Sequence, residues 1–331
     1  MTHALVTGAN GFIGANIVRD LLQRGIDVRA LCRSGSDRSA LDGLSIDIVE
    51  GDVRDPRSLD AAMAGCSLVF HAAALYSFWV RPRRLIYDIN VGGTTNVLDA
   101  ALRAGVEKVV YTSSVAAVGH RPDGKPADET AIADPASVVG DYKQSKLQAE
   151  AVAVSYADRL PVVIVNPSFP VGPWDTKPTP TGRTVLDVIE RRMPAYLDTA
   201  MNVVDAEDVA AGHWLAAQRG RVGERYILGG ENVTMKDLVT IVAELAGVPV
   251  PRVCLPRAPI LALAYVNALW RMLSRSRRAP RMTPDTVRMS ATPMVFDASK
   301  AVEELGFPRT AARDALRKAV DWFVHGFARQ A

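Results

Sequence analysis

Two residues that can exchange protons, Tyr142 and Lys146, lie four positions apart in a segment whose pattern predicts a helix over residues 142–156. This spacing places the phenol and the ammonium on one helix face, about one turn apart. A free phenol has a pKa of about 10, so it is a poor acid or base at neutral pH unless a cation stabilises the phenolate. We therefore expect Lys146 to lower the pKa of Tyr142 and Tyr142 to act as a catalytic acid or base.

Ser114 is the third catalytic candidate, because it follows a predicted strand over residues 108–112. Ligands of open parallel α/β sheets bind at the carboxyl ends of the strands. A serine hydroxyl at that edge can hold a carbonyl or hydroxyl oxygen of a substrate against the phenol. Ser114, Tyr142 and Lys146 together predict acid–base chemistry on a carbonyl or alcohol group.

A glycine-rich turn, TGANGFIG at residues 7–14, lies between a predicted strand over 4–7 and a predicted helix over 11–25. In this context the first glycine permits a tight turn, the second lets the backbone approach a pyrophosphate, and the third allows close packing of helix and strand. The helix N-terminus presents backbone N–H donors to an anion. These features predict a dinucleotide site formed by Gly8, Asn10, Gly11, Phe12, Ile13 and Gly14.

The residue after the second predicted strand, over 27–32, indicates which dinucleotide binds. An acidic residue there would accept hydrogen bonds from the adenosine ribose, but the chain has Arg33. A guanidinium suits a 2′-phosphate, so NADP(H) is favoured and NAD(H) stays open; Arg33 could also be a solvated strand end. Asp52 and Val53, which follow the third predicted strand, are expected to meet the adenine.

The elements that must position these residues alternate between short β-branched runs and helical patterns. Runs that are apolar at consecutive positions suit a sheet covered on both faces. The sequence therefore predicts an α/β fold, a Rossmann-type doubly wound parallel sheet with a smaller, mainly helical C-terminal substrate domain. The predicted strands span residues 4–7, 27–32, 46–50, 68–71, 108–112 and 162–165, and the predicted helices span 11–25, 58–64, 93–104 and 142–156.

The second half of the chain is less regular. Residues 167–182 are rich in proline, glycine and threonine, which predicts a loop near the site without regular elements. Two further strands are expected around 202–204 and 225–228, and the remainder is expected to be largely helical. We expect a dinucleotide-binding domain and a substrate-binding domain. The first comprises residues 1–168 with a returning segment at about 201–229, and the second comprises residues 169–200 and 230–331.

Composition narrows the class of protein. The 331 residues carry 39 basic and 36 acidic side chains, a net charge of +3, which argues against a nucleic-acid partner. Three widely spaced cysteines form neither a disulfide framework nor a metal site, so we expect no metal and a reducing compartment. The N-terminus lacks the pattern of a secretory leader, and no apolar run reaches the roughly 18 residues of a membrane span. These features predict a cytoplasmic enzyme.

Several stretches together resemble the extended short-chain dehydrogenase/reductases, the NAD-dependent epimerase/dehydratase family. They are TGANGFIG (7–14), HAAA (71–74), NVGGTTNVL (90–98), YTSS (111–114) and YKQSK (142–146). Two further stretches, at 162–183 and 225–232, resemble the hopanoid-associated sugar epimerases, which are close to dihydroflavonol 4-reductase-like proteins. The nucleotide-sugar dehydratases of this family carry an Asp-Glu pair where this chain has Ser113 and Ser114, so dehydration is disfavoured.

The resemblance assigns roles to individual residues. It implies that Ser114 is the catalytic serine, that Tyr142 is the acid/base, and that Lys146 also holds the nicotinamide ribose. It further implies a homodimer that pairs through helices at 93–104 and 142–156. The residues that it places along the cofactor, near the nicotinamide, are His71, Ala72, Ala73, Pro167 and Ser168.

The expected reaction is hydride transfer between NADP(H) and a secondary alcohol or ketone carbon of a small-molecule substrate. With a sugar nucleotide the enzyme would be an epimerase of the hopanoid-associated type, which is the favoured hypothesis. With a free ketone or aldehyde, small or lipid-like, the same residues would give a reductase, and a non-catalytic dinucleotide-binding scaffold is the third alternative.

Arg183, Arg191 and Arg192 could bind a diphosphate or form a solvated helix face. Residues 259–278 could form an interfacial membrane helix or a cover for the substrate pocket.

Overall fold

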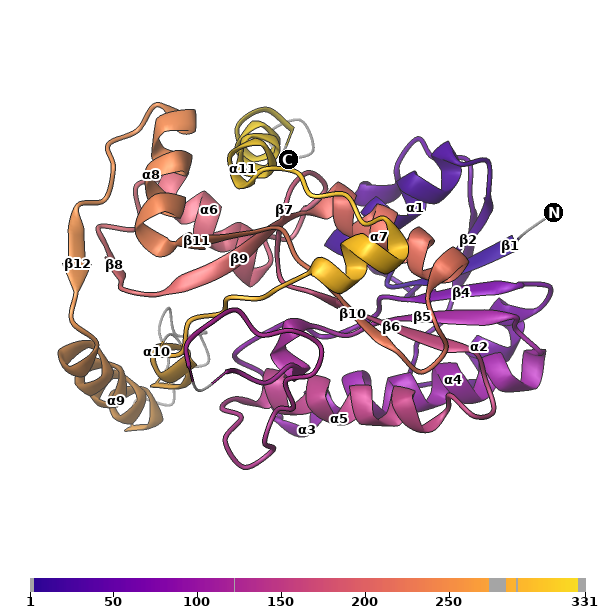
Figure 1. The fold of residues 1–331 in the computed structure, drawn as a ribbon. Helices are drawn as coiled ribbons and strands as arrows, with labels where there is room; N and C mark the ends of the chain where they lie inside the picture. Colours follow the sequence, from indigo (N-terminus) through magenta and orange to yellow (C-terminus); the bar gives the residue numbers. More distant parts are fainter. Residues whose placement is uncertain (1–2, 122, 274–283, 290, 327–331) are drawn as a thin grey trace.

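A seven-stranded parallel sheet forms the larger part of the protein in the computed structural model (Figure 1). The structure describes residues 3–121, 123–273, 284–289 and 291–326. The strand order across the sheet is β10-β6-β5-β4-β1-β2-β3. The strands are β1 (His3–Thr7), β2 (Asp27–Cys32), β3 (Asp47–Glu50), β4 (Leu68–His71), β5 (Lys108–Thr112), β6 (Val162–Pro167) and β10 (Arg225–Leu228).

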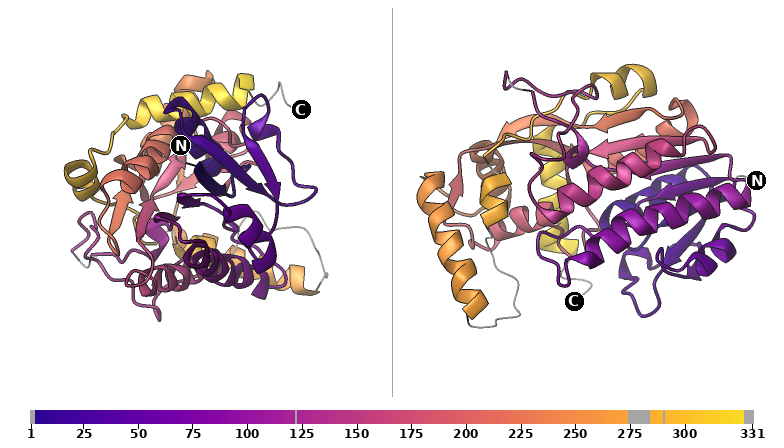
Figure 2. Two further views of the ribbon diagram at one scale, coloured as in Figure 1. Left: turned by 90° about the vertical axis from the view of Figure 1, so that its right-hand side faces the viewer. Right: turned by 90° about the horizontal axis from the view of Figure 1, so that it is seen from below.

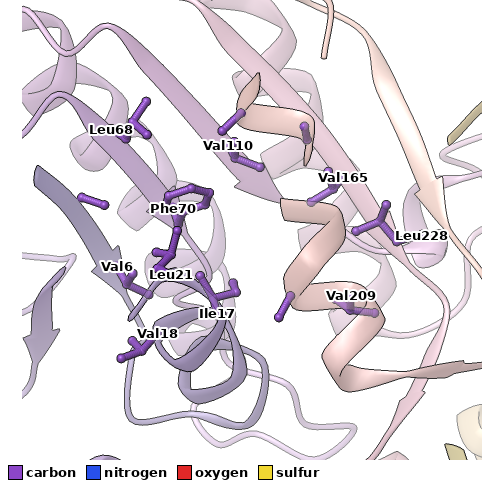
Figure 3. Close-up of a cluster of buried hydrophobic side chains, with 14 of the residues drawn as sticks. Val6, Ile17, Val18, Leu21, Leu68, Phe70, Val110, Val165, Val209 and Leu228 are labelled. Atoms are coloured by element: carbon purple, nitrogen blue, oxygen red, sulfur yellow. The ribbon is translucent and has the colours of Figure 1, made fainter. Parts of the chain in front are cut away.

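Helices cover both faces of this sheet. On one face α1 (Phe12–Gln23) packs against α7 (Ala206–Arg219), and on the other α2 (Pro56–Met63) and α5 (Asp141–Ser155) flank α4 (Gly93–Ala104) (Figures 1 and 2). The apolar core of the first face is drawn in Figure 3, where side chains of β1, β4, β5, β6 and β10 meet those of α1 and α7. Each fully buried aliphatic or aromatic side chain there contributes about 1.5–3 kcal/mol. The predicted doubly wound Rossmann sheet is confirmed.

The parallel arrangement brings the predicted site residues to one edge of the sheet. Because all seven strands run in the same direction, the glycine turn after β1, His71 at the end of β4 and Ser114 after β5 share that edge. Helix α5 starts there as well, immediately after Gly140, which has a φ of +92°. A positive φ is readily adopted only by glycine, so this residue lets the chain turn sharply into the helix that carries Tyr142.

The smaller part of the molecule lies beyond the carboxyl ends of the strands of the large sheet (Figure 1). It contains a three-stranded sheet in the order β11-β9-β7 and a two-stranded sheet of β12 and β8, with helices packed around them (Figure 1). Its strands are β7 (Phe169–Val171), β8 (Ala195–Leu197), β9 (Ala200–Asp205), β11 (Glu231–Thr234) and β12 (Val253–Leu255). Its helices are α6 (Pro180–Ile189), α8 (Met235–Ala246), α9 (Arg257–Leu273), α10 (Pro284–Met289) and α11 (Ala312–Asp321). A short helix, α3 (Arg84–Tyr87), precedes α4 in the larger part.

The expectation that residues 167–182 hold no regular element is wrong. Strand β7 includes Pro170 and pairs with β9 at the edge of the small sheet, where the missing N–H of proline leaves no partner unsatisfied. Helix α6 starts at Pro180, a position that favours proline, and Thr179 caps it by accepting a hydrogen bond from the Gly182 N–H.

The strand expected at 202–204 is longer and belongs to the smaller sheet, as β9, whereas β10 matches residues 225–228 and joins the large sheet. Asp205 ends β9 and caps α7 by accepting a hydrogen bond from the Glu207 N–H. The boundaries of the two expected domains stay a prediction.

Helix α9 lies at the far end of the smaller part, beside α10 (Figure 1). It covers residues 259–273 of the segment at 259–278, and the arginines at 275, 277 and 278 lie outside the described residues. Leu263 and Val266 are exposed on this helix. No helix in the described part of the chain is long and apolar enough to cross a membrane.

Candidate active site

The turn after β1 has the geometry that a dinucleotide phosphate requires. Gly8 has a φ of +67°, and a Cβ atom there would lie 2.7 Å from the Ala73 Cα. A Cβ on Gly14 would lie 2.0 Å from the Gly8 carbonyl oxygen, so only glycine lets α1 start this close to the strand. No side chain caps the N-terminus of α1, and its first turn has no acidic residue. Its backbone N–H groups can therefore bind an anion, and the residues present fit a pyrophosphate.

A groove of about 240 Å³ runs from this turn across the carboxyl edge of the sheet. It brings together residues from the glycine turn, from the strand ends and from α5, as the sequence analysis expects. Twelve of the predicted residues line it: Gly8, Asn10, Gly11, Phe12, Ile13, Gly14, Ala72, Ser114, Tyr142, Lys146, Pro167 and Ser168. The opposite wall contains Asp175, Thr176, Lys177, Thr179 and Thr181, which the sequence analysis did not single out.

Lys146 is 3% exposed, and its ammonium is held by β5. Its Nζ donates to the Thr112 carbonyl oxygen at 2.7 Å and to the Tyr111 hydroxyl at 3.0 Å. Burial lowers the pKa of Lys146 to about 7, although the nearby Glu150 carboxylate acts in the opposite direction. The strand therefore fixes this amine beside the groove in an environment where it can gain or lose a proton near neutral pH.

Tyr142 lies one turn from Lys146 on α5, but its pKa does not shift as expected. Burial raises the pKa of Tyr142 to about 12, and a hydrogen bond with Ser114 acts in the opposite direction. The expectation that Lys146 lowers this pKa is wrong for this structure, because desolvation of the phenolate dominates and the ammonium is bonded to β5. The phenol is therefore protonated at neutral pH, which suits a proton donor.

Two aromatic side chains pack around the Tyr142 ring. Its centroid lies 4.6 Å from that of Tyr76 and 6.0 Å from that of Phe78. Both residues belong to the irregular segment between β4 and α3, where hydrophobic periodicity carries no signal. Sequence reasoning missed them for that reason. They exclude water from one side of the phenol, which strengthens every polar interaction that it makes.

His71 has a structural place beneath the groove. Its Nδ1 lies 2.7 Å from the Thr7 hydroxyl and its Nε2 lies 3.1 Å from the Thr94 hydroxyl. Burial, followed by the charge of Lys146, lowers the pKa of His71 to about 3. A neutral imidazole with both nitrogens engaged orients the strand end and is not available as a base.

Comparison with known proteins decides the family. The model of the NAD dependent epimerase/dehydratase family matches residues 4–229. The chain belongs to this family. The resemblance to extended short-chain dehydrogenase/reductases is thereby confirmed, and the protein is an enzyme of the epimerase/dehydratase-type oxidoreductases.

Three relatives of this epimerase/dehydratase-family enzyme match over nearly their whole length. A Synechocystis sp. protein named "Putative dihydroflavonol 4-reductase" is 46% identical, over 98% of this chain and 95% of its own. Sterol demethylase protein B of Methylococcus capsulatus is 40% identical, over 96% of this chain and 97% of its own. A protein of known crystal structure, described as a nucleoside-diphosphate-sugar epimerase from Pseudomonas aeruginosa, is 30% identical in sequence. Its structure superposes on this one over 98% of each chain with a TM-score of 0.83.

An open hollow of about 580 Å³ lies at the end of the groove away from Tyr142, beside the residues that follow β2 and β3. Arg33 and Asp52 both line it, whereas Val53 is buried and packs beneath Gly93. The Arg33 guanidinium is exposed and makes no ion pair with another described residue, while Asp52 pairs with Arg54 at 2.7 Å. Arg33 is therefore free to bind an anion that enters this hollow.

The enzyme has a further cavity, of about 360 Å³, on the side of Tyr142 that faces the smaller part of the molecule. Tyr76, Ser114, Tyr142 and Ser168 line both this cavity and the cofactor groove. Its remaining walls are mainly apolar and include Val115, Ala116, Phe169, Pro180, Met201, Met235, Met294 and Phe296.

The three arginines considered as binding residues for a diphosphate lie outside the substrate cavity. Arg183, Arg191 and Arg192 are exposed and do not line the 360 Å³ cavity, and Arg192 pairs with Glu190 at 2.6 Å. Within the residues that the structure describes, no three His, Cys, Asp or Glu side chains are grouped so that they could hold a metal ion.

Proposed function

We propose that this enzyme uses NADP(H) to transfer a hydride at a secondary alcohol or ketone carbon of a mainly apolar substrate, with net reduction of the ketone. One observation carries the proposal: the apolar cavity meets the dinucleotide groove at Ser114 and Tyr142. A substrate carbon in the cavity would face the nicotinamide end of the groove, while the substrate oxygen contacts the serine and the phenol. Hydride transfer needs the cofactor in the groove, and proton transfer needs the substrate oxygen beside Tyr142, so the two steps can occur together only where the groove and the cavity meet.

The chain's own residues supply the proton and the orientation. Ser114 would hold the substrate oxygen, and Tyr142, neutral at neutral pH, would donate its proton to that oxygen as negative charge develops. The ammonium of Lys146 would stabilise the resulting phenolate, because Tyr142 and Lys146 line the same groove. The bound nicotinamide supplies the hydride. Tyr76 and Phe78 keep water from the phenol.

The choice of NADP(H) over NAD(H) is supported by Arg33, which is exposed beside the hollow at the adenosine end of the groove. Arginine binds phosphate through two parallel N–H donors, so a 2′-phosphate there would gain a charge-assisted contact. Pairing of two copies through α4 and α5, and a place in the cytoplasm, are further parts of this proposal. The two helices lie side by side along one face of the sheet (Figure 2).

A sugar-nucleotide epimerase is the second candidate, favoured by the relative from Pseudomonas aeruginosa that is described as a nucleoside-diphosphate-sugar epimerase. The triad serves either reaction, because oxidation followed by re-reduction on the opposite face of the carbon inverts a sugar with no net redox change. The substrate cavity is what favours the reductase, since a diphosphate needs several cationic partners and the cavity is mainly apolar.

Absorbance of NADPH at 340 nm separates the two candidates. We expect the purified enzyme to consume NADPH with apolar cyclic ketones, such as 2-decalone, and to show no turnover of UDP-glucose. Conversion of UDP-glucose to its epimer without net loss of NADPH would establish the epimerase instead. Binding of NADPH without turnover of either class would favour the non-catalytic scaffold.

A further inference from the structure

Lys143, the neighbour of Tyr142, is a buried cation that the proposed chemistry does not use. Its residue is 8% exposed, and it lines the apolar cavity together with Tyr142. It is the only charged side chain among the described residues that line this cavity. The cavity therefore contains one cation and no anion from those residues.

The contacts of Lys143 leave its charge without a partner. Its Nζ lies 3.4 Å from the Met294 sulfur, and a thioether is a weak acceptor. No carboxylate among the described residues forms an ion pair with it. Burial alone lowers the pKa of this ammonium, which agrees with the absence of an acidic neighbour in the described chain.

Such an arrangement costs folding free energy. Removing an ammonium from water is unfavourable by several kcal/mol unless an anion or several acceptors compensate. Lysine side chains usually avoid this cost by extending the charged end to solvent, but here the ammonium ends among the cavity walls. A methionine or leucine at this position would fill the same space without that cost, so the ammonium needs a function that balances it.

We propose that Lys143 binds a carboxylate of the substrate, so that the enzyme acts on apolar keto or hydroxy acids. This inference rests on the proposed function, because it assigns the cavity to the substrate of hydride transfer. The ammonium fixes the acid group, the apolar walls cover the hydrocarbon skeleton, and the reacting carbon is thereby oriented toward Tyr142 and Ser114. A charged pair formed in such a desolvated cavity discriminates strongly against a neutral analogue.

The test compares two ligands of equal shape, 2-naphthoate and 2-naphthamide, by calorimetry on the full-length protein saturated with NADPH. We expect the carboxylate to bind at least about 10-fold more tightly than the amide, a difference of about 1.4 kcal/mol. Lys143→Met should abolish this preference while NADPH binding persists. Lys236→Met, which removes an exposed lysine next to the cavity residue Met235, is the matched control and should keep the preference.

Equal affinity of the two ligands, absence of naphthoate binding at millimolar concentration, or a preference that survives Lys143→Met would overturn the inference. The Tyr142→Phe variant separates it from the proposed function. If that variant still turns over ketones while the carboxylate preference holds, only the catalytic proposal fails. If turnover depends on Tyr142 but the preference is missing, only the role of Lys143 fails.

Discussion

Replacement of Gly14 by alanine tests the glycine turn on which cofactor binding depends. The new methyl group would lie 2.0 Å from the Gly8 carbonyl oxygen and 2.9 Å from the Ala9 Cα. Ordinary carbon–oxygen contacts are more than 3 Å long, so α1 must move away from β1 by about 1 Å. Both neighbours are backbone atoms, and the strain cannot be relieved by a side-chain rotation. Overpacking of this kind costs about 1–3 kcal/mol of stability.

The same displacement moves the N–H donors at the start of α1 away from the pyrophosphate. We expect Gly14→Ala to weaken NADPH binding at least about 30-fold, which corresponds to about 2 kcal/mol. Calorimetric titration with NADPH gives the affinity, and a urea melt gives the stability. Gly92→Ala is the matched control, because a Cβ there meets nothing within 4 Å and the residue has a helical φ of −61°. It should bind NADPH normally and gain up to about 1 kcal/mol. A Gly14→Ala enzyme with the wild-type affinity and melting curve would refute the geometry of the turn.

Two further predictions concern the cofactor and the response to pH. Arg33→Ala should weaken NADPH binding about 10- to 100-fold and leave NADH binding unchanged, since a charge-assisted hydrogen bond contributes about 1.5–3 kcal/mol; equal losses for both cofactors would exclude contact with the 2′-phosphate. Burial lowers the pKa of His71 to about 3 and that of His213 to about 4, so each imidazole takes up a proton on unfolding below pH 6.5. Each should then lower the free energy of unfolding by about 1.4 kcal/mol per pH unit between pH 6.5 and about 4, measured in urea melts. Burial raises the pKa of Asp175 to about 6, which opposes this trend below pH 6, so Asp175→Asn should make the fall steeper. A stability that does not change from pH 7 to pH 5 would contradict the burial of both imidazoles.

The large sheet could be predicted from the sequence because its strands are apolar at consecutive positions, a pattern that is readily assigned to buried strands of a parallel sheet. The ranges expected for β4, β5 and β10 match the structure to the residue. The proline-rich stretch could not be predicted in the same way. Proline signals a break in most settings, but it is tolerated in an edge strand and favoured at the first position of a helix. Only the tertiary structure shows that β7 is an edge strand.

The site was predictable where spacing alone brings groups together. Tyr142, Lys146 and the glycine turn meet in one groove, as a one-turn spacing and a parallel sheet dictate. The direction of the Tyr142 pKa was not predictable, because the sequence does not reveal how fully the phenol is buried or that Lys146 is bonded to β5. Tyr76, Phe78 and the unpartnered Lys143 were missed, since their roles arise from packing between segments distant in the sequence.

The turnover number of Tyr142→Phe tests the central claim most directly. The variant removes only the hydroxyl that would donate the proton, and it keeps the ring that packs against Tyr76. In the NADPH absorbance assay with an apolar ketone, the account predicts that kcat falls about 10²- to 10⁴-fold while the affinity for NADPH stays within about twofold of the wild type. A variant that binds NADPH normally and retains more than a tenth of the wild-type kcat would contradict it.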